Sequence, residues 1–153
     1  MGSTGRMTIA IFSCYVAGFV GSLFIAPDAA AWYARLSKPS LTPSNWVFFP
    51  VWMVLYGLMG IAFGRIWSKT PLWYAWNGLF CVSLAFNAAW VMFFFGYHTI
   101  FIALADLACL VVLLITLILH AWEIDRFGTY LLLPYLGWVI FAGYLNTGIF
   151  LLN

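Results

Sequence analysis

Apolar residues fill most of this chain in five long runs, at about residues 7–26, 45–66, 72–96, 99–120 and 128–151. Each run is close to the roughly 20 residues that a helix needs to cross the hydrocarbon core of a bilayer. The runs do not show the alternation that marks the strands of a membrane barrel. The pattern predicts an all-α integral membrane protein, a bundle of five transmembrane helices forming a single domain over residues 1–153.

The longest interruption of the apolar pattern lies between the first two runs, at about residues 27–44. Asp28 can cap a short helix that extends to Leu36. Lys38-Pro39 ends this helix, because a residue before proline resists the α conformation. The loop is stiff, aromatic and basic, whereas a flexible tether is rich in glycine and serine. We expect a short helical lid over an apolar cavity.

Composition supports the membrane assignment. Of the 153 residues, 66% are hydrophobic and 7% are charged, whereas about a quarter of the residues of a soluble domain are charged. The formal net charge of +2 is too small and too scattered for nucleic-acid binding. Cys14, Cys81 and Cys109 lie inside the runs without metal-ligand spacing, so we expect buried thiols and no metal site.

The first run also has an alternative interpretation as a signal peptide, because it follows Arg6. It is longer than the 7–15 apolar residues typical of such a segment, and no small-x-small site directly follows it before Pro27. These features favour a retained first helix.

Basic residues in the loops indicate the orientation. One side of a five-span bundle carries four of them and the lid side carries Arg35 and Lys38, the four being Arg6, Arg65, Lys69 and Arg126. The positive-inside rule therefore favours a cytoplasmic N-terminus.

Polar side chains deep in the runs mark a candidate site. Asn87 falls about halfway through the third run, where an amide needs a partner. Trp138, Ala142 and Asn146 follow one another at i,i+4 spacing, so a small residue leaves a notch between an indole and an amide. Both asparagines are as consistent with a hydrogen bond between helices as with ligand contact. Asp106 is the only acid well inside a run, where a neutral or hydroxyl-paired acid is favoured over proton transfer.

The order and spacing of these residues resemble the tryptophan-rich sensory protein/translocator protein family, the TspO/MBR family. The matching positions cover nearly the whole chain from Pro27 onward: Trp32-Tyr33, Leu36, Lys38-Pro39, Pro43, Trp46, Pro50, Trp52, Tyr56, Phe86-Asn87, Trp90, Phe94-Phe95-Gly96, Ala103-Leu104, Asp106, Leu133-Pro134-Tyr135-Leu136, Trp138, Ala142 and Leu145-Asn146.

The resemblance implies a five-helix bundle, commonly a homodimer, with a ligand pocket closed by the first loop. Family members bind porphyrins such as protoporphyrin IX and other hydrophobic ligands, so a porphyrin is the expected ligand, membrane lipid is a further partner and no cofactor is required. The membrane implied is a bacterial cell membrane, or the mitochondrial outer membrane in a eukaryote. The ligand-binding positions carried over are Tyr33, Pro39, Trp52, Phe86, Asn87, Trp90, Trp138, Ala142 and Leu145.

Several functions stay open at this level. The leading one is a receptor with a sensory or tetrapyrrole-regulating role. An enzyme that degrades porphyrin with light and oxygen is the alternative, and it would use Trp52 and Trp138, which correspond to tryptophans implicated in this activity in some members. Transport of porphyrins or lipids ranks last, because secondary transporters usually contain repeated halves. From the residues alone, the deep tryptophans could also be ordinary packing between helices.

The sequence departs from the family pattern in the lid. Ser40 and Leu41 occupy positions that are often aromatic, and Ser44 replaces the second proline of a common double proline. No Lys or Arg follows Tyr144, so the proposed cholesterol motif is incomplete and we do not predict sterol binding by that pattern.

Overall fold

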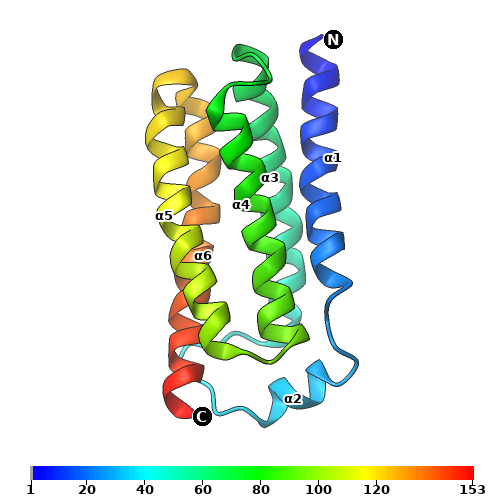
Figure 1. The fold of residues 1–153 in the computed structure, drawn as a ribbon, viewed down its shortest axis with the longest axis vertical. Coiled ribbons are helices and arrows are strands. Elements are labelled where there is room, and N and C mark those ends of the chain that lie inside the picture. Colours follow the sequence, from blue (N-terminus) through cyan, green and yellow to red (C-terminus); the bar gives the residue numbers. More distant parts are fainter. Residues whose placement is uncertain (1) are drawn as a thin grey trace.

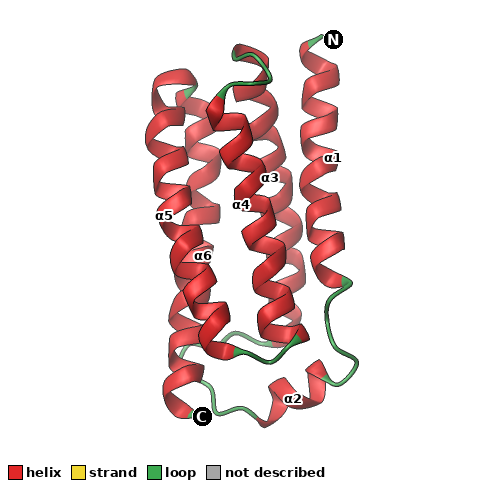
Figure 2. Ribbon diagram, viewed as in Figure 1, coloured by secondary structure: helices red, strands yellow, loops and turns green. Residues whose placement is uncertain are grey.

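The computed structural model describes residues 2–153, and these form a helical bundle. Five helical segments are long and apolar enough to cross a membrane. They stand side by side, and one short helix, α2, lies across one end of the bundle (Figures 1 and 2). The predicted all-α, five-span architecture is confirmed. The elements are α1 (Ser3–Ser22), α2 (Ala29–Arg35), the 3-10 turn η1 (Asn45–Val47), α3 (Phe48–Lys69), α4 (Ala75–Val91), the π-helical turn η2 (Met92–Gly96), α5 (Ile100–Ile124) and α6 (Arg126–Leu152).

The ends of the helices differ from the predicted ends by a few residues. The first span ends at Ser22 instead of residue 26. The chain turns there, and the Ala26 N–H donates to the Phe95 carbonyl at 3.1 Å, which directs the chain toward α2. Asp28 stands at the N-cap of α2, but its side chain makes no capping hydrogen bond, so that part of the prediction is wrong.

The third span does not remain an α-helix to its end. Over η2 the backbone widens into a π-helical turn, in which the Tyr97 N–H donates to the Met92 carbonyl at 2.8 Å. Phe94 and Phe95 follow each other here with their ring centroids 4.8 Å apart. Such turns are frequent at functional sites, and this one faces the lid helix.

Glycines bring α1 close to α3. A Cβ atom at Gly60 would lie 2.5 Å from the Cα atom of Ile11, and one at Gly64 would lie 2.8 Å from the Cα atom of Met7. Inside a bilayer the association of helices depends on such close van der Waals packing, because lipid is as apolar as the side chains.

The three cysteines do not share one environment. Cys14 is buried, as expected, whereas Cys81 and Cys109 are exposed. The expectation of buried thiols is therefore wrong for two of them. A thiol is apolar enough to face lipid from the outside of a transmembrane helix.

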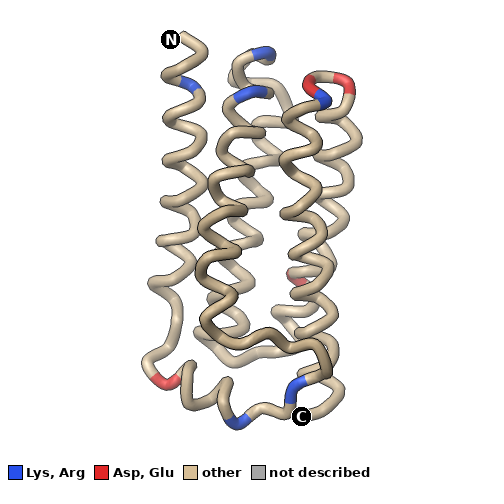
Figure 3. Tube along the Cα trace, turned by 180° about the vertical axis from the view of Figure 1, so that it is seen from behind, with Lys and Arg blue, Asp and Glu red and all other residues tan. Residues whose placement is uncertain are grey.

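Charged residues gather at the two ends of the bundle. Figure 3 shows Lys and Arg near these ends. Asp106 is a buried acid within the membrane-spanning helix α5. The two groups of basic residues used to assign the orientation therefore lie at opposite ends of the molecule.

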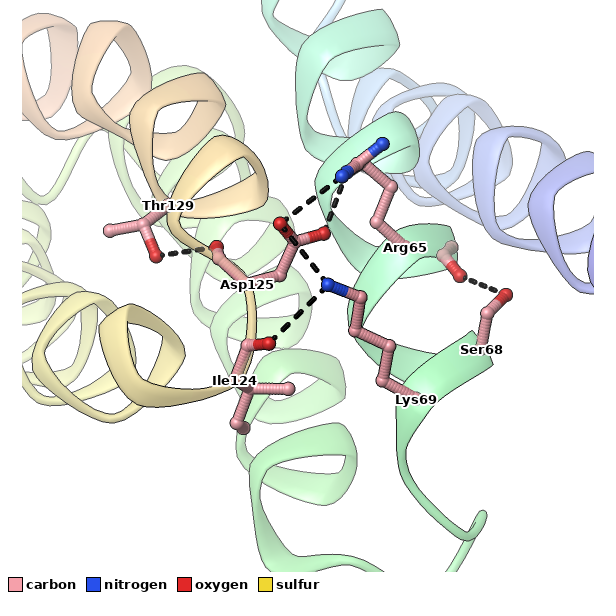
Figure 4. Close-up of polar contacts among 7 residues, drawn as sticks. Arg65, Ser68, Lys69, Ile124, Asp125 and Thr129 are labelled. Atoms are coloured by element: carbon pink, nitrogen blue, oxygen red, sulfur yellow. Dashed lines mark hydrogen bonds and ion pairs between the residues drawn. The ribbon is translucent and has the colours of Figure 1, made fainter.

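An ion-pair cluster joins α3, α5 and α6 at the end opposite α2 (Figure 4). The Asp125 carboxylate accepts hydrogen bonds from Arg65 Nε at 2.7 Å and Arg65 Nη2 at 3.2 Å, and Lys69 Nζ lies 3.5 Å away. Burial of Asp125 acts to raise its pKa, but the hydrogen bond and charge of Arg65 and the charge of Lys69 outweigh burial and hold the pKa below its ordinary value.

Candidate ligand-binding cavity

A cavity of about 670 Å³ lies at the end of the bundle that α2 covers. Its walls come from α1, α2, η1 with the start of α3, the end of α4 with η2, and α6. The lining is mainly apolar and aromatic, with a few polar side chains. Small-molecule sites typically have volumes of about 300–1,000 Å³ and a lining of this kind.

Five of the predicted ligand-binding residues lie on the cavity wall, namely Tyr33, Trp52, Trp90, Ala142 and Leu145. The two indoles belong to aromatic stacks. The ring of Trp52 stacks on Tyr56 with centroids 5.4 Å apart, and that of Trp90 stacks on Phe94 at 5.5 Å.

The other four predicted residues, Pro39, Phe86, Asn87 and Trp138, do not line the cavity. Trp138 packs edge-on against Phe48 at 5.9 Å, and it is Phe48 that lines the cavity. Phe86 packs against the buried core. The family resemblance implied that all four contact the ligand.

Asn87 is occupied by hydrogen bonds between helices. Its Oδ1 accepts from the Tyr56 hydroxyl at 2.7 Å, and its Nδ2 donates to the Tyr135 hydroxyl at 3.2 Å. The residue is 3% exposed. The two hydrogen bonds connect α4 to α3 and α6 and satisfy an amide that is buried at this depth. They also fix the position of Tyr56, on which Trp52 stacks.

A second polar bridge uses Trp90 and Asn146. Trp90 Nε1 donates to Asn146 Oδ1 at 3.2 Å, and Asn146 Nδ2 donates to the Ile100 carbonyl at 2.9 Å. Since the indole N–H is already bonded, Trp90 offers a guest mainly its ring face.

Three side-chain donors on the wall are available to a ligand. The hydrogen bonds described among residues 2–153 do not involve the Tyr33 hydroxyl, Trp52 Nε1 or the side-chain amide of Asn45, and all three residues line the cavity. Burial raises the pKa of Tyr33, so its hydroxyl stays a donor at neutral pH. Lys38 Nζ lies 4.6 Å from the centroid of the Tyr33 ring, which adds a cation beside this donor.

Comparisons with known proteins agree with the residue pattern. The profile of the TspO/MBR family matches residues 10–152. The chain belongs to the TspO/MBR family. It is 36% identical over 153 residues to the tryptophan-rich protein TspO of Archaeoglobus fulgidus, with 97% of each chain covered. It is also 36% identical over 137 residues to the translocator protein of Homo sapiens, which covers 84% of this chain and 78% of that protein.

Other residues that line the cavity of this TspO/MBR protein were not predicted from the sequence. They come mainly from α1 and from the start of α3: Tyr15, Gly18, Phe19, Ser22, Asn45, Phe48, Phe49 and Met53. No periodic signal identifies them, because the side of a transmembrane helix that faces lipid is as apolar as the side that faces a hydrophobic cavity.

The second half of the TspO/MBR lid, residues 36–44, is tied to α6. The Ser37 N–H donates to Asn153 Oδ1 at 3.0 Å, and Asn153 Nδ2 donates back to the Ser37 carbonyl at 3.0 Å. The Tyr144 hydroxyl donates to the Ser40 carbonyl at 2.7 Å. The Ser40 hydroxyl, which departs from the family pattern, also lies 3.2 Å from the Tyr144 hydroxyl and adds a side-chain hydrogen bond to this tie.

The first half of the lid is held by aromatic contacts. Trp32 on α2 stacks on His98 with centroids 4.2 Å apart and meets the edge of Phe94 at 5.3 Å. Tyr33 packs against Phe95 at 5.8 Å. Together with the ties to α6, these contacts hold the lid across the end of the bundle at the cavity.

Proposed function

We propose that this TspO/MBR protein is a membrane receptor for porphyrin-like tetrapyrroles and related hydrophobic ligands, with a sensory or tetrapyrrole-regulating role. The observation that carries the proposal is the lidded cavity of about 670 Å³, with the indole rings of Trp52 and Trp90 on its wall. Flat, polarizable rings suit a planar macrocycle, and the donors on Tyr33 and Trp52 suit its propionate groups.

The family resemblance supports a porphyrin as the guest, and no cofactor is needed for binding. The proposed contacts are Tyr33, Trp52, Trp90, Ala142 and Leu145, whereas Pro39, Phe86, Asn87 and Trp138 do not line the cavity. Lys38 adds a positive charge that attracts an anionic propionate to the lid.

The setting of the receptor is part of the proposal. The membrane is a bacterial cell membrane, and the lid faces away from the cytoplasm by the positive-inside rule. A second copy of the chain is the proposed protein partner. Ala85 on α4 supports this pairing, because it is a small residue on the exposed face of a transmembrane helix and permits close helix approach.

Quenching of tryptophan fluorescence tests the ligand and the site together. Protoporphyrin IX is titrated against the protein in lipid nanodiscs. We expect saturable quenching, with the dissociation constant raised about tenfold by Trp52→Phe, a loss of about 1.4 kcal/mol. Trp138→Phe should have a smaller effect, because Phe48 separates Trp138 from the cavity. Trp73→Phe is the control, since Trp73 is 87% exposed in the α3–α4 loop. Saturation that neither Trp52→Phe nor Trp90→Phe changes would refute the site.

Light-dependent porphyrin breakdown is the second candidate function. It is favoured by the position of Trp52, an oxidisable indole on the cavity wall that stacks on Tyr56. If the protein is an enzyme, illumination in the presence of oxygen should bleach the bound porphyrin faster than an unrelated membrane protein does. Trp52→Phe should slow the bleaching more than Trp138→Phe. Equal bleaching with the unrelated protein would exclude catalysis.

A further inference from the structure

We infer that the hydrophobic guest enters the cavity sideways from the bilayer, through a portal between α1 and α3, and not past the lid from the water phase. The inference rests on the proposed function, because it concerns the route of a cavity ligand. The portal is defined by Phe19 and Ser22 on α1 and by Phe49 and Met53 on α3, all of which line the cavity.

The portal residues face the cavity and the lipid at the same time. Phe19 is 64% exposed and Phe49 is 73% exposed, although both line the cavity. Exposed wall residues on two neighbouring helices indicate the edge of an opening. In a transmembrane bundle this edge lies within the apolar layer, so the cavity reaches the lipid-facing surface here.

The opposite wall of the cavity is closed. Ala142, Leu145 and Ile149 on α6 are all under 9% exposed, as is Phe94 in η2. The exposed wall residues lie between α1 and α3 and around the lid, where Ile25, Ala30 and Asn45 are exposed, whereas the α6 wall is closed. The Tyr15 hydroxyl, which donates to the Met53 carbonyl at 2.9 Å, marks the deep edge of the portal.

The two routes differ in the contacts that a guest must break. Opening the lid separates Ser37 from Asn153 and Ser40 from Tyr144, with the loss of their hydrogen bonds. Opening the portal requires only rotation of apolar side chains, since aromatic Phe19 and Phe49 make no hydrogen bonds through their rings. The portal is the lower barrier for a molecule that already dissolves in the membrane.

Helix α1 is held closely along its whole length. Gly60 and Gly64 on α3 allow the approach of Ile11 and Met7, and in the other half of α1 a Cβ atom at Gly18 would meet the Tyr56 ring. Entry through the portal is therefore assigned to rotation of Phe19 and Phe49 and not to a shift of α1.

A change at the portal should alter rates more than affinity. Stopped-flow quenching by protoporphyrin IX in nanodiscs gives the association and dissociation rate constants. We expect Phe49→Ala and Phe19→Ala to raise both constants at least fivefold, with the dissociation constant changed less than threefold. Phe12→Ala is the matched control, because Phe12 is 69% exposed on the same helix but does not line the cavity. It should leave both constants within twofold of the wild type.

A variant whose lid is cross-linked to the C-terminus distinguishes the two entry routes. Ser37→Cys and Asn153→Cys together place a disulfide across the Ser37–Asn153 tie, in a background with Cys81→Ala and Cys109→Ala. The oxidised and reduced forms of this variant are compared, with the cross-link verified by mass. We expect association rates within twofold of each other. A tenfold slower rate in the oxidised form, with Phe19→Ala and Phe49→Ala without effect, would overturn the portal. Absence of saturable quenching by the wild type would instead overturn the proposed function itself.

Discussion

At the scale of single residues, Asn87 shows how polar groups are accommodated inside the bundle. The amide bonds both Tyr56 and Tyr135, so its removal leaves two buried hydroxyls without this partner. We expect Asn87→Ala to lower the free energy of unfolding by about 1–2 kcal/mol, the upper range for polar contacts between membrane helices. Thermal unfolding in detergent measures this change.

Thr116→Ala is the control for this prediction. Its hydroxyl bonds the Val112 carbonyl at 2.9 Å on the exposed side of α5, within one helix. Its loss should cost less than about 0.5 kcal/mol. An equal effect of the two substitutions would show that Asn87 does not hold the helices together.

The sequence predicted how deep in the membrane the tryptophans lie better than it predicted which of them point into the cavity. Trp52, Trp90 and Trp138 were all predicted to contact the ligand, and of these Trp52 and Trp90 line the cavity, whereas Trp138 packs against Phe48. The i,i+4 spacing of Trp138 and Ala142 puts them on one flank of α6. It cannot show which of them a neighbouring helix covers, because that depends on Phe48 from a distant part of the sequence.

At the scale of elements, the lid depends on a glycine in α6. A Cβ atom at Gly148 would lie 2.5 Å from Pro39, so alanine there displaces the lid, although it favours the helix by about 1 kcal/mol. We expect Gly148→Ala to speed amide hydrogen exchange of residues 36–44 about tenfold. Gly137→Ala is the control in the same helix, since its Cβ would meet nothing within 4 Å. Unchanged exchange in Gly148→Ala would contradict this role of the glycine.

The spans and the short lid helix could be predicted because their signals are local. Long apolar runs and the Lys38-Pro39 stop act within one segment of chain. The π-helical turn η2 and the contribution of α1 to the cavity could not be predicted. Phe94 is buried by Trp32 and Tyr33 of the lid, and Phe19 faces both cavity and lipid, so neither position has a sequence pattern of its own.

The Asp125 cluster gives the junction of α3, α5 and α6 a dependence on pH. The folded pKa of Asp125 lies below that of the unfolded chain, about 3.9. The stabilisation is therefore complete at neutral pH and is lost as the pH falls below about 4 through the folded pKa. We expect Asp125→Asn to lower Tm at pH 7, and the difference from the wild type to narrow toward pH 3.

Glu123→Gln is the control for the pH dependence, because Glu123 is exposed on the neighbouring turn of α5. Its Tm should follow that of the wild type at every pH. A gap between the wild type and Asp125→Asn that stays constant from pH 7 to pH 3 would exclude an ionised Asp125 as its cause.

At the scale of the whole molecule, the bundle has two different ends. Ion pairs close the end that carries Arg65, Lys69 and Asp125, and a lidded cavity occupies the other (Figures 1 and 4). The sequence predicted the lid and the side on which each basic residue lies, but it did not predict the ion pairs of Asp125. It could not give the volume of the cavity, which depends on how α1 packs against α3.

A ligand that occupies this cavity must be excluded when a larger side chain fills the cavity. Ala142 lines the cavity, whereas an atom added at the adjacent Gly143 would meet nothing within 4 Å. Protoporphyrin IX is titrated against Ala142→Phe, Gly143→Phe and the wild type, with Tm measured for each protein. We predict that Ala142→Phe weakens binding more than tenfold at a Tm close to that of the wild type, and that Gly143→Phe binds within twofold. Full affinity in a folded Ala142→Phe protein would show that protoporphyrin IX binds outside this cavity.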